Sequence, residues 1–489
     1  MQNSTLQPTY KGNDRLLYGI ILGVLAFWLF AQTTLNINVG MAEDLGMEQN
    51  MMNIAVSITS LFSGIFIVVF GGLADRIGRV KMIQIGFIFS IIGSALVALT
   101  PAGTLATPVL MVGRIFQGLS GAAIMPASLA LVKAYWDGAS RQRAVSLWSI
   151  GSWGGSGFCA LFGGLVASNF GWRYIFWATV IISIIGFLMV KGTPESKGEP
   201  KANYTFDLAG VITFMLSIIG LQLFLSNGSS WGWTSAISLV LAAAFVIFGF
   251  IFFRIESKNS NAFVDFKLFK NLTYTGATIS NFLLNATAGI LIVSLSLVQL
   301  GAGLISQESG LLTLGYAIAI VAFIRVGEKL LQRFGARKPM IWGSIIVGIS
   351  IILLMQTQLM TESYKILAII SYTLFGLGLA FYATPSTDAA LSNLPEDQAG
   401  AGSGIYKMAS SLGVALGVAV SAAIFTALSG ASDSIKWMDG LITFVGRQDN
   451  LAIRQGAMIA LGVNLLMVIL AIISIVLTVP KHTKETLPK

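Results

Sequence analysis

Long apolar stretches alternate with short polar stretches along the whole chain. Each apolar stretch extends over roughly 18 to 25 residues, the length that an α-helix needs to cross the hydrocarbon core of a bilayer. The alternation therefore predicts fourteen membrane-spanning helices. We expect them at residues 15–37, 51–74, 82–99, 107–132, 144–167, 173–191, 207–226, 235–254, 273–299, 308–326, 339–358, 364–384, 402–428 and 456–479.

Composition supports this assignment. The 489 residues are 55% hydrophobic and 10% charged, with a mean hydropathy of +0.80. A soluble domain carries about 25% charged residues, so this chain lacks the polar side chains to cover a water-facing surface. We predict an all-α polytopic membrane protein. The first apolar stretch follows Lys11 and Arg15 without a small-residue cleavage site, which favours a retained helix over a signal peptide.

The basic residues predict an orientation. With the N-terminus in the cytoplasm, most of the 30 lysines and arginines fall in cytoplasmic loops or tails. Arg114 and Lys407 lie inside spans, and the outer loops receive only Arg173, Lys365, Lys436, Arg447 and Arg454. This bias sets the orientation of helical membrane proteins. We therefore expect a multi-pass protein of the cell membrane with both termini cytoplasmic. Topology also explains the net charge of +9 without a nucleic-acid partner.

An internal repeat divides the chain. Three pairs of landmarks keep nearly the same spacing: Gly78 with Gly335, Pro126 with Pro385, and Gly155 with Gly413. Such a repeat predicts that helices 1 to 6 return as helices 9 to 14, with helices 7 and 8 inserted. We expect a six-helix bundle at 1–191 and a cytoplasmic linker with the inserted helices at 192–265. A second six-helix bundle follows at 266–489, with a long outer loop near 429–453.

Residues 71–81, GGLADRIGRVK, place paired glycines, one acid and three bases between two predicted spans. We interpret this loop as a cytoplasmic latch. In this interpretation Asp75 faces the positive N-terminus of a helix in the same half, with Arg76 and Arg79 as counter-charges. The alternative is that the bases only set the orientation.

Two basic residues inside spans are candidates for proton coupling or gating. A charge within the membrane is costly unless it is paired or hydrated, so Arg114 and Lys407 are functional candidates by default. Arg114 alternatively acts as a hydrogen-bonding hub to backbone carbonyls. Asp388 is the acid best placed to pair with Lys407, in an ion pair that opens and closes with the cytoplasmic gate. A static salt bridge at a helix end is the alternative.

Two repeated bundles can enclose a site at the bilayer midplane and rock about it. Aromatic rings offer a stacking surface for planar or cationic compounds, and neutral amides give orientation. Ordinary packing or an interfacial belt of aromatic residues is the alternative explanation. The candidate substrate-binding residues are Gln32, Asn36, Gln117, Trp148, Trp153, Asn281, Asn285, Tyr382 and Tyr406.

Several function classes are disfavoured. The only cysteine, Cys159, lies in an apolar stretch, and the only histidine, His482, lies in the C-terminal tail. Disulfides are therefore excluded, and we expect neither a metal site nor a cofactor. The chain has no phosphate-binding loop of the G-x-x-x-x-G-K-[ST] kind, which argues against an ATP-driven pump. No catalytic triad is recognisable, so we do not expect an enzyme.

Two motifs carry a family resemblance. GGLADRIGRVK resembles the loop between helices 2 and 3 of the major facilitator superfamily, and RIFQGLSGAA at 114–123 resembles its helix 4 motif. With fourteen predicted spans, the chain resembles the superfamily's drug:proton antiporter branch. Further stretches resemble the Nor-type quinolone and multidrug exporters of Gram-positive bacteria: FWLFAQ at 27–32, WSIGSWGGSG at 148–157, VDFKLFKN at 264–271, NFLLN at 281–285, IRVGEKLLQ at 324–332 and YATPSTD at 382–388.

The resemblance implies a proton-coupled multidrug efflux antiporter that works by alternating access and functions as a monomer. The implied partners are protons, the lipid bilayer and amphipathic drugs such as fluoroquinolones and quaternary ammonium dyes. Some signature positions differ, because Ala31 and Gly40 stand where the branch has an acid and a proline, and Gln332 replaces the acid in the second loop copy. Alternatives are export of an endogenous metabolite or lipid-like compound, and a non-transporting membrane sensor.

Overall fold

The computed structural model describes residues 10–136, 140, 143–144, 147–148, 150–197, 207–259, 262, 264–391, 399–430, 435, 438 and 442–481. Fourteen helices in this part of the chain are long and apolar enough to cross a membrane, which confirms the predicted number and the all-α class. They are Asp14–Leu45, Gln49–Ile77, Arg79–Ala98, Ala106–Tyr135, Ile150–Phe170, Arg173–Val190, Leu208–Gly228, Ala236–Glu256, Leu272–Gly301, Ser306–Phe334, Arg337–Leu354, Thr361–Ala390, Gly404–Ser429 and Leu451–Thr478.

Ten of these spans are single α-helices, and several extend beyond the predicted bounds. They are α3 (Gln49–Ile77), α4 (Arg79–Ala98), α5 (Ala106–Tyr135), α8 (Arg173–Val190), α9 (Leu208–Trp231), α10 (Ala236–Glu256), α15 (Arg337–Leu354), α16 (Thr361–Leu391), α17 (Ala399–Ser429) and α18 (Leu451–Thr478). The extensions are polar turns that hydropathy does not detect. Thus α3 continues through most of the predicted latch loop and stops only at Gly78, where φ is +122°.

The other four spans are interrupted. The first contains α1 (Asp14–Leu25), the π-turn η1 (Ala26–Phe30), the 3-10 turn η2 (Ala31–Thr33) and α2 (Thr34–Leu45). The ninth, its repeat partner, contains α11 (Leu272–Ala286), α12 (Gly289–Ser296) and the π-turn η5 (Leu297–Gly301), preceded by the 3-10 turn η4 (Phe266–Lys270). The fifth begins with the π-turn η3 (Ile150–Gly154) and continues as α7 (Gly155–Phe170), and the tenth joins α13 (Ser306–Leu312) to α14 (Leu314–Phe334). Such turns release backbone groups for other partners and frequently mark functional sites.

The connections between spans define two ends of the molecule. We call the Gly46 end the one at which residues 46–48, 99–105, 171–172, 302–305 and 355–360 connect helices. The opposite Gly78 end carries the connections at 78, 191–197 and 335–336. These are the predicted outer and cytoplasmic ends, respectively. The chain begins α1 and finishes α18 at the Gly78 end, as an even number of spans requires.

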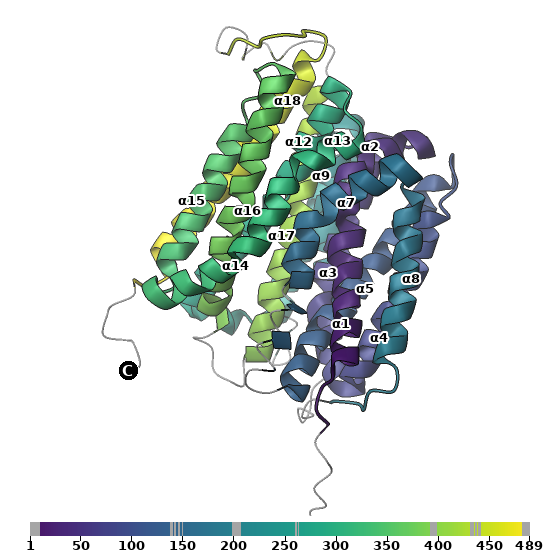
Figure 1. Ribbon diagram of the computed structural model, residues 1–489, viewed down its shortest axis with the longest axis vertical. Helices are drawn as coiled ribbons and strands as arrows, with labels where there is room; N and C mark the ends of the chain where they lie inside the picture. Colours follow the sequence, from purple (N-terminus) through teal and green to yellow (C-terminus); the bar gives the residue numbers. More distant parts are fainter. Residues whose placement is uncertain are drawn as a thin grey trace, which may run out of the picture.

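Helix packing is repeated in the two halves of the chain (Figure 1). In the first half, α3 packs on α5, α4 packs on both α5 and α8, and α8 packs on α1. In the second half, α14 packs on α16, α15 packs on both α16 and α18, and α18 packs on α11. Helix for helix this is the same arrangement, displaced by the repeat that the sequence landmarks indicate.

Two helix pairs join the halves. The first pair sets α7 against α13 and α14, and the second sets α17 against α3. The inserted helix α9 contacts both α3 and α17, and α10 packs mainly on α9. Only 6% of the apolar stretch of α10 is buried inside the protein, so this helix presents its surface to lipid. The inserted pair therefore covers one side of the interface between the halves.

Glycines allow the close contacts, as small residues do between membrane helices. A Cβ atom at Gly164 of α7 would lie 2.1 Å from the carbonyl oxygen of Ser306, across the interface. On α17, Gly417 has the same function toward the carbonyl oxygen of Ala286, only 2.0 Å from the Cβ position. That second contact lies within one half, on α11. The glycine at 417 therefore packs the second half together rather than joining the halves.

Candidate substrate cavity

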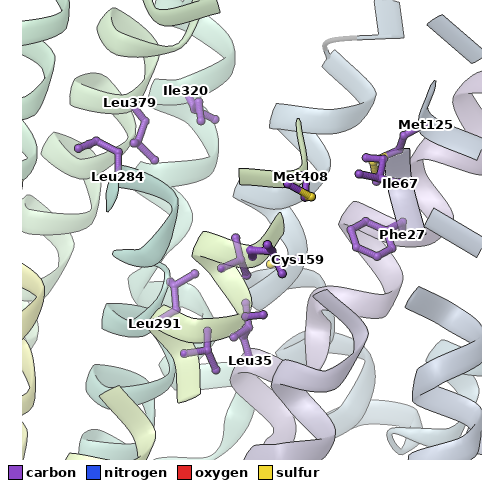
Figure 2. Close-up of a cluster of buried hydrophobic side chains, with 14 of the residues drawn as sticks. Phe27, Leu35, Ile67, Met125, Cys159, Leu284, Leu291, Ile320, Leu379 and Met408 are labelled. Carbon is purple, nitrogen blue, oxygen red and sulfur yellow. The ribbon is translucent and has the colours of Figure 1, made fainter. Parts of the chain in front are cut away.

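A cavity lies between the two halves; its space, counted together with the solvent open to it, amounts to about 930 Å³. Most of its wall is apolar or aromatic, and Figure 2 shows part of the surrounding cluster, which includes Ile67 and Met125 from the first half and Met408 from the second. The lining residues are Trp28, Gln32, Leu35, Ile67, Met125, Trp148, Ser152, Trp153, Ser156, Leu284, Asn285, Ala288, Leu291, Tyr316, Phe375, Leu379, Tyr382, Lys407, Ser410, Ser411 and Val414.

Five of the predicted binding residues line this cavity: Gln32, Trp148, Trp153, Asn285 and Tyr382. The amide of Gln32 donates a hydrogen bond to Ser60 Oγ over 3.0 Å, and the amide of Asn285 donates to Asn281 Oδ1 over 2.9 Å. The Tyr382 hydroxyl is 2.7 Å from Ser280 Oγ. These bonds fix the orientation of the polar groups in the wall.

The other four predicted binding residues lie outside the lining. Gln117 accepts from Arg114 and donates to Ser94 Oγ over 3.0 Å, and Asn281 donates to Ser410 Oγ over 2.7 Å. Tyr406 points its hydroxyl at Ser386 Oγ, 2.7 Å away, and Asn36 joins the halves as described below. The physical reason is the same in each case, because a buried amide or hydroxyl must satisfy its hydrogen bonds and here does so between helices.

Lys407, predicted as a gating residue, also lines the cavity; the other lining residues were not predicted, although helical periodicity contained a signal for many of them. Trp148, Ser152 and Ser156 follow one another at four-residue steps, which places them on one face of a helix. Phe375, Leu379 and Tyr382 follow at steps of four and three on α16. Steps of three and four residues along the helix from each predicted residue, which stay on one face of that helix, lead to these positions.

The Lys407 side chain contributes charge to the cavity. Its Nζ lies 5.7 Å from the centroid of the Trp148 ring, a cation–π distance. Trp148 Nε1 donates to Ser128 Oγ over 2.9 Å, so the indole ring is held in place. The predicted ion pair with Asp388 is not among the ion pairs of the described residues: Asp388 is exposed near the Gly78 end of α16. This conformation thus shows Lys407 engaged with an aromatic ring.

Arg114 on α5 is fully buried at the centre of the first half. Its guanidinium donates to the carbonyl oxygens of Ala31 and Ala55 over 2.7 and 2.8 Å, and to Gln117 Oε1 over 2.7 Å. It also donates to Thr34 Oγ1 over 2.9 Å. The interrupted turn η2 presents the Ala31 carbonyl. These are the contacts of a hub that ties α3 and the break of the first span to α5, and a role in proton coupling stays a prediction.

The halves are hydrogen-bonded to each other at the Gly46 end. Asn36 Nδ2 donates to the carbonyl oxygens of Ala160 and Ser306 over 2.7 and 3.0 Å. Its Oδ1 accepts from Gln299 Nε2 over 3.0 Å and from Ser309 Oγ over 2.9 Å. We call these five residues the Asn36 clasp. Since every polar atom of the Asn36 side chain is used across or beside the interface, this residue closes the Gly46 end rather than lining the cavity.

Further cross-half bonds support the clasp. The amide of Asn169 donates to Gln307 Oε1 over 3.1 Å, and the backbone N–H of Gln307 donates to Ser168 Oγ over 3.0 Å. On the other side of the interface, Asn53 Nδ2 donates to Thr426 Oγ1 over 3.1 Å. All of these residues lie in the part of their helices nearest the Gly46 end.

At the Gly78 end, Asp75 contacts one of its two predicted counter-charges, while a different carboxylate occupies the N-terminus of a helix. Asp75 forms an ion pair of 2.8 Å with Arg79, one turn away. The carboxylate at a helix N-terminus is that of Glu195, which accepts from the backbone N–H groups of Val80 and Lys81 over 2.8 and 3.1 Å. An anion at this position is favoured by the helix dipole. Arg76, the third predicted latch residue, is exposed on α3.

Comparison with known proteins identifies the family to which this architecture belongs. The sequence profile of the Major Facilitator Superfamily matches residues 20–261 and 277–488. The chain belongs to the major facilitator superfamily. It is 44% identical over 481 residues to the Quinolone resistance protein NorB of Staphylococcus aureus strain MRSA252, covering 98% of this chain and 99% of that protein. The NorB protein of strain COL matches with the same identity and coverage.

Solved structures agree on the fold. The POT family transporter PepTSo superposes with a TM-score of 0.63 at 16% identity, over 95% of this chain and 98% of that one. A D-xylose–proton symporter superposes with a TM-score of 0.63 at 15% identity, over 96% and 97% of the two chains. This superfamily consists of transporters, so the chain is a multi-pass membrane protein of a transporter family and not an enzyme, as the motifs at 71–81 and 114–123 predicted.

Proposed function

We propose that this protein is a proton-coupled exporter of amphipathic aromatic compounds, with quinolones among its substrates. One observation supports the proposal most strongly: a cavity lined largely by aromatic and apolar side chains lies between two halves of repeated packing. NorB, which is named for quinolone resistance, aligns over nearly the whole chain. A site enclosed by two such halves can be exposed to either side of the membrane in turn.

Alternating access follows from the unequal ends of the interface. In this conformation the Asn36 clasp closes the Gly46 end. Each such hydrogen bond contributes about 1 kcal/mol net, so breaking the cluster costs a few kcal/mol unless bonds form elsewhere. A free-energy difference of that size lets substrate or proton binding shift the population between two states. We propose that the Gly78 end faces the cytoplasm and that the clasp opens when substrate is released outside.

Proton coupling requires a group that gains and loses a proton during the cycle. The lining formed by the described residues contains no carboxylate. Asp388 lies on α16 beyond the lining residue Tyr382, toward the Gly78 end. It is our candidate proton carrier, and Lys407 and Arg114 are candidate gating residues. Movement of α16 against α17 would expose Asp388 differently in the two states.

Efflux from proteoliposomes tests the proposal. Vesicles loaded with a quinolone and given an imposed pH gradient should export the drug faster with the protein than without it, and a protonophore should abolish the difference. Asp388→Asn should remove the dependence on the gradient, whereas Asp449→Asn, which changes an exposed acid of an outer loop, should not. Equal drug loss from vesicles with and without the protein would overturn the proposal.

A further inference from the structure

The charge of the cavity supports a second conclusion. It rests on the proposed function and concerns the chemical class of the substrate. Lys407 is the only charged side chain among the described residues that line the cavity. Its ammonium makes no ion pair with any residue that the structure describes; its recorded contact is the ring of Trp148, 5.7 Å away. A cation in such surroundings is costly and is ordinarily paired.

We propose that Lys407 is an anion subsite that selects aromatic carboxylates over permanent cations. An ammonium has three hydrogen-bond donors and no acceptor, so a carboxylate is a matching partner. A ligand carboxylate would supply the counter-charge that the described wall does not provide. A quaternary ammonium group brings a second positive charge into the same cavity, and like charges in a poorly hydrated site repel strongly.

The walls position the rest of such a ligand. Trp148 is held by its bond to Ser128, and Trp28, Trp153 and Tyr316 supply further aromatic surface. A flat ring system that stacks on this surface brings a carboxylate attached to its edge toward the Lys407 ammonium, which already lies against the Trp148 ring. The site therefore recognises an aromatic plane and an anionic edge together. Dyes that offer only an aromatic plane and a fixed positive charge can stack on the rings, but the Lys407 ammonium repels their charge.

Direct binding tests this inference without requiring transport. The purified protein, reconstituted in lipid nanodiscs at neutral pH, is titrated with a quinolone carboxylic acid, with the methyl ester of the same quinolone, and with ethidium as a planar permanent cation. We expect the acid to bind at least about tenfold more tightly than its ester, because a desolvated charge pair contributes that much or more. Equal affinity for acid and ester in the unmodified protein would overturn the inference.

Substitutions of Lys407 test whether this residue causes the preference for the acid over its ester. Lys407→Met should weaken binding of the acid by about tenfold or more, leave the ester within about twofold, and strengthen binding of ethidium. Lys407→Arg keeps the positive charge and should keep the preference for the acid. Lys329→Met, which removes an exposed lysine from α14, is the matched control and should change none of the three affinities. An equal loss of acid and ester affinity in Lys407→Met would contradict the inference.

The remaining outcomes distinguish a failure of the anion subsite from a failure of the transport proposal. If Lys407→Met does not fold, the comparison of acid and ester on the unmodified protein decides alone. If the acid binds more tightly than its ester but neither leaves proteoliposomes, the subsite stands and the transport proposal falls. If both compounds are exported and bound equally, the transport proposal stands and the anion subsite is wrong.

Discussion

The two ends of the interface between the halves are held in different ways. At the Gly46 end, side chains of one half bond to the other, through Asn36 and Gln299 above all. At the Gly78 end, Glu195 holds two backbone N–H groups of α4, and Asp75 pairs with Arg79, both within the first half. The halves approach there through apolar contacts, with Val68 Cγ2 3.5 Å from the Cβ position of Gly404.

This difference indicates which end is ready to open. Directional bonds fix the relative position of two surfaces, whereas small apolar contacts allow them to slide or separate at little cost. Contacts within a half make that half rigid without joining it to its neighbour. The structure thus corresponds to a state that is closed at the Gly46 end. The predictions below separate residues that hold one half together from residues that hold the halves to each other.

Arg114→Met should have the largest effect, and on stability rather than on the balance of states. The change leaves the Ala31 and Ala55 carbonyl oxygens and Gln117 without their buried donor. Losing one partner of a buried charged network costs about 3 to 5 kcal/mol. Thermal unfolding followed by tryptophan fluorescence should show the loss. Arg114→Lys recovers one donor group only and should recover part of it; a variant as stable as the wild type would show that the hub is dispensable.

Asn36→Leu should have the next largest effect and should act between the halves. Unsatisfied buried partners cost about 1 to 3 kcal/mol each, and here they are Gln299, Ser309 and the Ala160 carbonyl. These unsatisfied groups raise the free energy only of the state that is closed at the Gly46 end. The variant should therefore populate the alternative state. Labelling of a cysteine introduced at Ser309 in a Cys159→Ser background should become faster, since Ser309 is buried here. Unchanged labelling would mean that the clasp does not hold the end shut.

Glu195→Gln should have a smaller effect and stay within the first half. The neutral amide oxygen can still accept one hydrogen bond from the start of α4, but the charge–dipole attraction is lost. Such an interaction at an exposed helix end contributes about 0.3 to 1 kcal/mol. The melting temperature should fall slightly, with no change in labelling at Ser309. A change in that labelling would show that the Gly78 end is coupled to the clasp.

Asp449→Asn should have the smallest effect, and only above acidic pH. The Arg447 guanidinium donates to both Asp449 carboxylate oxygens and lowers the pKa of that carboxyl below its ordinary value of 3.8. A lowered pKa in the folded state means that the stabilisation is present above pH 3.8 and is lost as pH falls through the folded pKa. The pair is exposed, so the melting temperatures should differ by at most about one degree at pH 7, and the difference should vanish as pH falls through the folded pKa. A difference that grows at low pH would contradict the assignment.

The spans and their repeat were predictable because hydropathy and charge bias report directly on the bilayer. The breaks in the first and ninth spans were not, because the residues of η1 and η5 are as apolar as their neighbours. In the first span, the carbonyl oxygen of Ala31 at the break accepts from Arg114, a contact between distant parts of the sequence that hydropathy does not report.

The candidate site was partly predictable. Residue type correctly indicated Trp148, Trp153 and Tyr382 as cavity residues, but it cannot distinguish an amide that faces the cavity from one that bonds between helices. Asn36 and Asn285 look alike in sequence, and only the position of Gln299 on a distant span gives Asn36 its role. Likewise, the sequence suggested an acid as the partner of Lys407, whereas the fold places an indole ring there.

The most direct test of the account measures distances between the halves at both ends at once. In a Cys159→Ser background, one spin-label pair at Phe170 and Ile305 reports on the Gly46 end, and a second pair at Lys133 and Lys329 reports on the Gly78 end. All four positions are exposed. Rocking about the cavity predicts that, as substrate and pH are varied, a longer distance at the Gly46 end accompanies a shorter one at the Gly78 end. Distances that stay constant, or that lengthen together at both ends, would contradict it.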